Sequence, residues 1–255
     1  MIKENMHIHS NYSWDCKMKL NDIAETLVKN GISYATITDH VELDKEPLPY
    51  VLTSLKIRNV EIDRINEIYE GKLVLYKGVE ISEPNLYPKE VELINELALD
   101  LIMGSVHKID RSAKTMVGIK NAYYEYYKRL MSMITTRKID VVGHLDYINR
   151  YYDFNYFTPN QIKELLQAIK ENNQIIEINT SAARRCSYST FPTTDTIKEY
   201  RNIVGKYVTI GTDAHEVSEL VSGLSDIDSL IDTYNIQPVV FEKRKMKELK
   251  PPTYI

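Results

Sequence analysis

The sequence predicts an α/β fold, specifically a TIM-like barrel of seven parallel strands alternating with helices. Seven short apolar runs predict strands, and each is followed by a segment whose apolar residues recur at helical spacing. No glycine-rich nucleotide loop follows the first run. Polar residues suited to metal binding stand at the ends of nearly all the runs, and only a closed ring of strands brings such ends to one centre. An open, doubly wound sheet is the rival architecture.

The predicted strands and helices alternate from one end of the chain to the other. The strands cover Asn5–His9, Tyr34–Thr38, Leu73–Ile81, Leu101–Val106, Asp140–Gly143, Ile175–Asn179 and Tyr207–Gly211. The helices cover Leu20–Asn30, Pro49–Glu70, Lys89–Ala98, Ile119–Arg137, Pro159–Asn172, Thr193–Val204 and Ser225–Tyr234. Gly31 ends the first helix, and Pro159 is a suitable first helical residue after Thr158. Because no linker interrupts the alternation, we expect one domain over residues 1–255, with a solvated basic end at 241–255.

Composition excludes several classes of protein. The chain has 255 residues, 43% of them hydrophobic and 27% charged, as expected for a globular protein with a real core. Its net charge of -4 argues against a general affinity for nucleic acid. Two cysteines, Cys16 and Cys186, are too few for a secreted disulfide framework and favour free thiols. With no signal pattern and no membrane-length apolar run, a cytoplasmic protein is expected.

All six histidines stand at the ends of predicted strands. His7 and His9 form an HxH pair, and residues two apart in a strand point to the same side. The other four close the runs TITDH, MGSVH, DVVGH and TIGTDAH as His40, His107, His144 and His215. Any one of them is more often a structural residue than a ligand. Their joint placement at one end of successive strands is improbable by chance, so it indicates a polynuclear metal site.

Carboxylates accompany these histidines. The candidate ligands are His7, His9, Asp15, His40, Glu80, His107, His144, Asp213 and His215. Imidazole and carboxylate without cysteine suit Zn²⁺, Mn²⁺ or Fe²⁺, and nine ligands suit three ions rather than one. Glu80, central in the order, would serve as a bridging carboxylate. Asp39 either orients an imidazole or caps a helix. Because clustered metals activate water and clamp phosphoryl oxygens, a metal-dependent hydrolase is the first hypothesis.

The strings HIH, TDH, GVEIS, GSVH, VVGH and TDAH, in that order from His7 to His215, resemble the polymerase-and-histidinol-phosphatase (PHP) family. The resemblance implies a distorted (β/α)₇ barrel that holds a trinuclear site. One ion would be bound by His7, His9, Glu80 and Asp213; a second by Asp15, His40 and His215; and a third by Glu80, His107 and His144. Some family members carry histidine where this chain has Asp15, which changes the charge on the second ion.

Two further stretches are similar to the stand-alone histidinol-phosphate phosphatases of that family. GHLDYINRYY resembles their GHLD-x-x-x-R segment and implies that Arg150 contacts phosphate. EINTSAARR resembles their EINTSGLR segment and implies the same for Arg184. Here Ala182 replaces the usual glycine and Arg185 doubles the arginine, so either arginine could face the pocket. The resemblance implies hydrolysis of L-histidinol phosphate in histidine biosynthesis.

The expected reaction is hydrolysis of a small phosphate monoester. The arginines would hold non-bridging oxygens, and the metal cluster bridged by Glu80 would activate water. Asp213, His215 or a metal-bound water could protonate the leaving group. One acidic residue on the loops after the second and third strands (Glu42, Asp44 or Glu83) is expected to contact the substrate amine.

Two rival functions stay open. A phosphodiesterase or exonuclease could use the same metals on nucleic-acid ends, but no basic stripe interleaved with aromatic residues is present. A metal-binding regulatory protein without activity is the other rival, and the complete ligand set argues against it. The sequence leaves the metal identity and the oligomeric state open.

Overall fold

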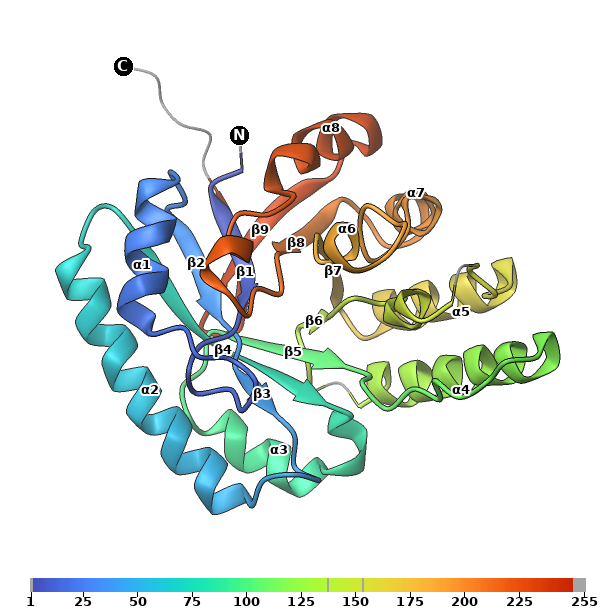
Figure 1. The fold of residues 1–255 in the computed structure, drawn as a ribbon, viewed down its shortest axis with the longest axis horizontal. Helices are drawn as coiled ribbons and strands as arrows, with labels where there is room; N and C mark the ends of the chain where they lie inside the picture. The colour runs from blue at the N-terminus through green and yellow to red at the C-terminus, as the bar shows by residue number, and fades with distance from the viewer. Residues whose placement is uncertain (1, 137, 153, 250–255) are drawn as a thin grey trace.

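Parallel strands form the centre of the molecule, and helices surround them (Figure 1). The computed structural model describes residues 2–136, 138–152 and 154–249. Neighbouring strands follow the order β1 (Glu4–Ile8), β2 (Tyr34–Ile37), β4 (Val74–Ser82), β5 (Leu101–Ser105), β6 (Val141–Val142), β7 (Ile175–Asn179) and β8 (Tyr207–Gly211). Each of these strands runs parallel to the next. The two-residue β3 (His40–Val41) continues beyond β2 and pairs His40 with Glu80 of β4.

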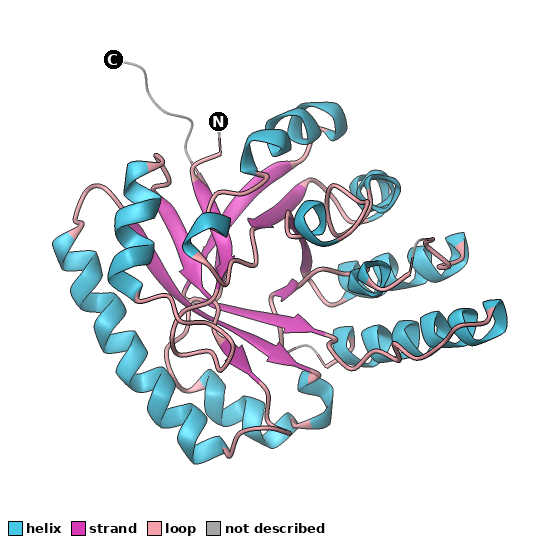
Figure 2. Ribbon diagram, in the orientation of Figure 1, coloured by secondary structure: helices cyan, strands magenta, loops and turns pink. Residues whose placement is uncertain are grey.

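The helices lie outside the strands (Figure 2). They are α1 (Leu20–Lys29), α2 (Leu48–Ile68), α3 (Pro88–Asn95), α4 (Met116–Ile134), α5 (Pro159–Glu171), α6 (Ala182–Arg185), α7 (Thr194–Ile203) and α8 (Leu224–Tyr234), with 3₁₀ turns η1 (Pro84–Leu86), η2 (Tyr147–Arg150) and η3 (Val217–Glu219). The main core lies between strands and helices, where Ile37 of β2 and Leu27 of α1 are fully buried. Thr158 and Gln161 form a capping box that starts α5.

The strands close into a ring because β1 lies beside β8. The backbone N–H of Asp213 donates to the carbonyl of His7 at 2.9 Å, and that of His9 donates to the carbonyl of Ala214 at 3.1 Å. Ile8 and Ala214 form a parallel bridge. This closure confirms the predicted α/β barrel with seven parallel strands and excludes the open sheet.

The barrel is distorted at β1. Asn5 pairs with Ala35 and Ile8 with Ile37, so three steps along β1 match two along β2. Such a bulge changes which face a side chain occupies. Met6 therefore packs against Val240 in a small hydrophobic cluster. Its neighbour His7 instead contacts Glu177 in the candidate site described below.

A hairpin at the end of the chain fills the opposite end of the barrel. Its first strand, β9 (Gln237–Glu242), runs parallel to β8, and its second, β10 (Lys245–Glu248), returns antiparallel to β9. Val239 and Phe241 pack against Leu101, Met103 and Val141 at the starts of β5 and β6. The expectation of a solvated end over 241–255 was therefore wrong for Phe241, because its side chain packs against strands far away in sequence. Residues 250–255 lie outside the described part of the chain.

The other predicted elements are confirmed with shifts of a few residues at their ends. The predicted helix Ile119–Arg137 corresponds to α4, and residue 137 lies outside the described residues. Short elements such as β3 and α6 were not predicted, since they contain too few residues to show a period. Among the described helices, none combines the length and apolarity needed to cross a membrane.

Candidate metal centre

The carboxyl ends of the strands converge on a cavity of about 600 Å³. The nine candidate ligands lie at or beneath this cavity: His7, His9, Asp15, His40, Glu80, His107, His144, Asp213 and His215. They come from the strands β1, β3 and β4 and from the loops after β1, β5, β6 and β8. Closure of the ring is what brings them together, because the first and last ligands are separated by most of the sequence.

The first group consists of His7, His9 and Asp213 together with Glu80, all buried. The Nε2 atoms of His7 and His9 are 3.0 Å apart. Asp213 Oδ1 lies 3.2 Å from His9 Nε2 and 3.6 Å from His7 Nε2. Glu80 Oε2 lies 3.5 Å from His7 Nε2 and 3.6 Å from His9 Nε2. Four ligand atoms thus surround one point.

The geometry of this group fits a cation. His7 Nδ1 donates to the carboxylate of Glu177 at 2.8 Å, so its Nε2 faces His9 Nε2. Two imidazole nitrogens with lone pairs cannot meet at 3.0 Å unless a proton or a metal lies between them. Burial acts to lower the pKa of His7, but Glu177, Glu80 and Asp213 outweigh it and raise that pKa well above its ordinary value. Burial, with His40 and His215 nearby, lowers the pKa of His9 to about 3. The position between the two Nε2 atoms therefore suits a positive charge, which a proton or a metal ion would supply.

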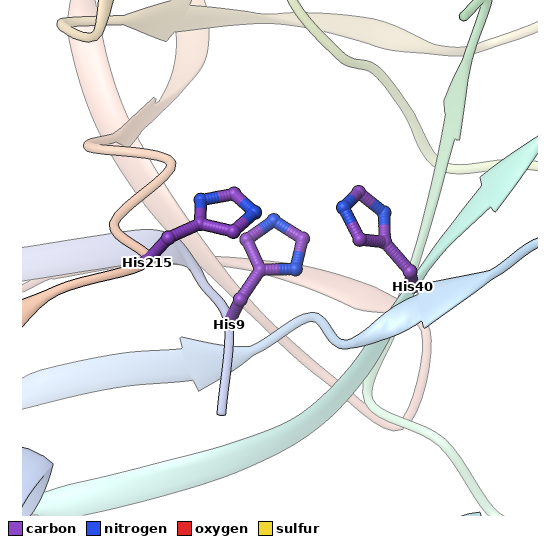
Figure 3. A group of neighbouring side chains, drawn as sticks. All are labelled: His9, His40 and His215. Carbon is purple, nitrogen blue, oxygen red and sulfur yellow. The ribbon is translucent and has the colours of Figure 1, made fainter. Parts of the chain in front are cut away.

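The second group consists of Asp15, His40 and His215, next to His9. Figure 3 shows the rings of His9, His40 and His215 facing one another, and His9 lies 4.2 Å from each of the other two, centroid to centroid. Asp15 Oδ2 is 3.4 Å from His40 Nε2 and 3.3 Å from His215 Nε2. His215 Nδ1 donates to the carbonyl of Asp213 at 3.0 Å, which leaves its Nε2 facing Asp15. Burial acts to raise the pKa of Asp15, but His215 and His40 lower it below its ordinary value.

The third group consists of His107 and His144 around Glu80. Glu80 Oε1 lies 2.8 Å from His144 Nε2 and 3.2 Å from His107 Nε2, and it accepts from Ser105 Oγ at 2.6 Å. Glu80 Oε2, directed at His40 Nδ1 at 3.0 Å, has no hydrogen-bond partner among the described residues. A buried carboxylate oxygen without a hydrogen bond, surrounded by imidazole nitrogens, fits a bridging ligand. The donor set of nitrogen and oxygen suits Zn²⁺, Mn²⁺ or Fe²⁺.

Glu177 of β7 is a buried residue of the site that sequence analysis missed. Its Oε1 accepts from His7, and its Oε2 accepts from the His144 N–H at 2.9 Å and the Asn179 side chain at 3.1 Å. A Cβ at Gly211 would lie 2.0 Å from Glu177 Oε1, so only glycine leaves room for this carboxylate. The available signal was a charged residue inside the apolar run IIEIN.

Asp39 does not cap a helix, because α2 begins only at Leu48 after the N-cap Pro47. Its carboxylate accepts from the side chains of Ser10 and Ser13 instead. Two roles were predicted for Asp39, and the geometry agrees with the one in which Asp39 orients an imidazole. It does so through Ser13, which contacts both Asp39 and His9.

The predicted phosphate-binding arginines occupy different positions. Arg150 lines the cavity, donates to the hydroxyl of Tyr147 and lies 5.4 Å from the centroid of that ring. Arg185 also lines the cavity. Arg184 instead donates to Glu219 Oε1 at 3.1 Å and to the Thr212 carbonyl at 2.7 Å, beneath the loop that carries Asp213. Lys45 and Arg111, which were not predicted, add positive charge to the cavity wall.

The three acidic loop residues also differ. Glu42 lines the cavity, pairs with Lys45 and lies 3.4 Å from His107 Nδ1. Glu83 is buried and accepts the backbone N–H groups of His107 and Lys108 at 2.9 and 2.8 Å. Asp44 pairs with Lys108 at 2.9 Å. Of these three carboxylates, only that of Glu42 borders the cavity.

The chain is similar to several known proteins. The PHP domain profile matches residues 5–181. The chain is 26% identical to a probable histidinol-phosphatase of Clostridium acetobutylicum, over 94% of this chain and 97% of the relative. It is 25% identical to a probable histidinol-phosphatase of Thermotoga maritima, over 96% and 98%. A crystal structure of histidinol phosphate phosphatase from Lactococcus lactis, in complex with zinc, L-histidinol and phosphate, covers 96% of this chain and 99% of its own, with a TM-score of 0.79 and 20% identity.

Proposed function

Because the chain belongs to the PHP domain family, we propose that it is a metal-dependent phosphomonoesterase that hydrolyses L-histidinol phosphate to L-histidinol and phosphate. The observation that carries the proposal is the convergence of nine candidate ligands on one cavity that Arg150 and Arg185 also line. Histidinol-phosphatase relatives that match over nearly the whole chain support the choice of substrate.

Three divalent ions, of Zn²⁺, Mn²⁺ or Fe²⁺, would be held by the three groups of ligands. The first group is His7, His9, Asp213 and Glu80; the second is Asp15, His40 and His215; the third is Glu80, His107 and His144. When bound, such ions supply Lewis acidity that lowers the pKa of water and offsets phosphoryl charge.

The cationic residues of the cavity wall would bind the phosphate. Arg150 and Arg185 would donate charge-assisted hydrogen bonds to non-bridging oxygens, and the fork of each guanidinium suits two oxygens at once. The Tyr147 hydroxyl and ring hold the Arg150 guanidinium in place. Arg184 would act indirectly. It holds Glu219, whose other carboxylate oxygen accepts a hydrogen bond from the backbone N–H of His215 at 2.9 Å.

Two further roles belong to the same proposal. Glu42, at the cavity wall, would receive the ammonium group of the substrate in place of Lys45. Asp213 and His215 are the candidates for delivering a proton to the leaving oxygen, since both line the cavity.

Phosphate release from L-histidinol phosphate by protein reconstituted with Mn²⁺ tests the function. A panel of other monoesters and a short single-stranded DNA are the comparisons. A strong preference for L-histidinol phosphate is expected. Cleavage of DNA or nucleotides without turnover of L-histidinol phosphate would still agree with a metal-dependent enzyme, but it would overturn the assigned substrate.

A further inference from the structure

A buried serine connects the first two ligand groups to the body of the barrel. Ser13 Oγ lies 3.2 Å from His9 Nδ1, 2.9 Å from Asp39 Oδ1 and 3.0 Å from the backbone nitrogen of His40. Ser13 is 4% exposed and the other three residues are buried or nearly so, so bulk water does not compete for these contacts.

The three contacts use the full hydrogen-bonding capacity of one hydroxyl, which has one donor and two acceptor positions. The carboxylate of Asp39 can only accept, so it takes the Ser13 proton. The backbone N–H of His40 can only donate, so it occupies one acceptor position. The remaining acceptor position faces His9 Nδ1, which must therefore carry a hydrogen.

Asp39 is held as an acceptor from its other side. Arg58 of α2 is fully buried, and its Nη1 lies 3.3 Å from Asp39 Oδ2. The Ser10 backbone N–H donates to Asp39 Oδ1 at 2.6 Å, and the Ser10 hydroxyl contacts both oxygens. These donors engage both carboxylate oxygens of Asp39 as acceptors, so the Ser13 hydroxyl donates to Asp39.

We infer that Ser13 is a positioning residue that holds His9 in the tautomer with hydrogen on Nδ1, so that the Nε2 lone pair is directed at Asp213 and His7. The same hydroxyl ties the His40 backbone to His9, and thus sets the spacing between ligands of two adjacent groups. A role of Ser13 in catalysis rests on the proposed function, whereas the tautomer of His9 does not depend on that function.

The first test reads the tautomer of His9 directly in metal-free protein. Long-range ¹H–¹⁵N correlation spectra of protein labelled with [¹⁵N]histidine at pH 8 distinguish a protonated from an unprotonated ring nitrogen, and H9N identifies the His9 signals. We expect hydrogen on Nδ1 of His9. Hydrogen on Nε2 in the unmodified protein would overturn the inference, whatever any variant does.

The second test compares two serine variants. Ser13→Ala removes the hydroxyl that contacts His9, whereas Ser10→Ala removes an equally buried hydroxyl that donates to the same Asp39 but does not contact an imidazole. In S13A we expect a mixture of His9 tautomers and a loss of Zn²⁺ affinity of about 10-fold or more. S10A should keep the His9 tautomer and lose less affinity.

Equal effects of S13A and S10A on tautomer and affinity would reduce Ser13 to a general structural role and overturn the inference. The affinity is measured by titration with Zn²⁺ alone and the tautomer by NMR, so neither measurement depends on turnover. If L-histidinol phosphate proves not to be a substrate, the tautomer and affinity results are unaffected, and the two failures can be told apart.

Discussion

Glu177 Oε1 and His7 Nδ1 are 2.8 Å apart, and both residues are fully buried. They are separated by 170 positions in the sequence, and the hydrogen bond between them fixes which nitrogen of His7 faces the candidate metal centre. Carboxylates that hold histidine ligands in this way make the imidazole more basic and orient its ring.

Glu177→Gln should therefore weaken metal binding. Glu177 accepts hydrogen bonds on both oxygens, from His7 Nδ1 and from the backbone N–H of His144. The NH₂ group of glutamine would face one of these two N–H groups and could not accept from it. We expect an affinity loss of about 10- to 100-fold for Zn²⁺, measured by competition with a chelator. Glu171→Gln, at an exposed position of α5, is the matched control and should bind like the unmodified protein. Unchanged affinity in E177Q would contradict the role of Glu177.

Metal affinity should rise with pH. Burial acts to lower the pKa values of the histidines, but acidic neighbours raise that of His7 well above its ordinary value, that of His40 to about 9 and that of His107 to about 10. Below these pKa values each imidazole holds a proton that a metal must displace.

Between pH 6 and 8 the apparent association constant for Mn²⁺ should increase about tenfold per pH unit for each proton released. Calorimetry in buffers of different ionisation enthalpy counts these protons directly. An affinity independent of pH over this range, with no proton release, would show that the metal-free site is already deprotonated.

Replacement of Arg184 and replacement of Arg185 should have different effects on the kinetic constants. Arg185 lines the cavity, whereas Arg184 is bonded to Glu219 and the Thr212 carbonyl. Loss of a charge-assisted hydrogen bond to phosphate in Arg185→Met should lower kcat/KM for L-histidinol phosphate by about 10- to 100-fold. Arg150→Met should behave like R185M. Arg184→Met should act mainly by lowering thermal stability and metal affinity, and a larger rise of KM in R184M than in R185M would reverse the assignment.

Asp146 should make the stability of the metal-free protein depend on pH. Its carboxyl is fully buried, accepts from the Thr193 N–H at 2.8 Å on one oxygen, and has no described hydrogen-bond partner on the other. Burial raises its pKa from 3.8 to about 7. Because the folded-state pKa is raised, the unfolded state loses the proton first, and stability is lost as pH rises from about 4 to about 7.

Asp146→Asn removes this ionisation. The free energy of unfolding of D146N relative to the unmodified protein should therefore increase between pH 5 and pH 7, by up to about 1.4 kcal/mol per pH unit. Urea unfolding of metal-free protein at several pH values measures the difference. Asp195→Asn, on the exposed side of α7, is the control and should follow the unmodified protein. Parallel curves for D146N and the unmodified protein would show that Asp146 is ionised in the folded state.

Several features of the fold were predictable because they repeat within a short window. The strand at Ile175–Asn179 and the helix after Pro159 have local hydrophobic patterns and local caps, and both lie where the patterns indicate. β9 was not predicted, because its burial depends on contacts between Phe241 and strands a hundred or more residues away. Glu177 was missed for the same reason: its partner His7 lies at the other end of the chain.

The amino-acid sequence by itself determined the alternation of strands and helices and the placement of histidines and carboxylates at strand ends, because both follow from the local period and position of residues. The tertiary structure alone decided which nitrogen of each histidine faces the centre, that Arg185 rather than Arg184 borders the cavity, and that Ser13 connects Asp39 to His9. These features depend on contacts between segments that meet only when β1 closes against β8, so no pattern within one segment could specify them.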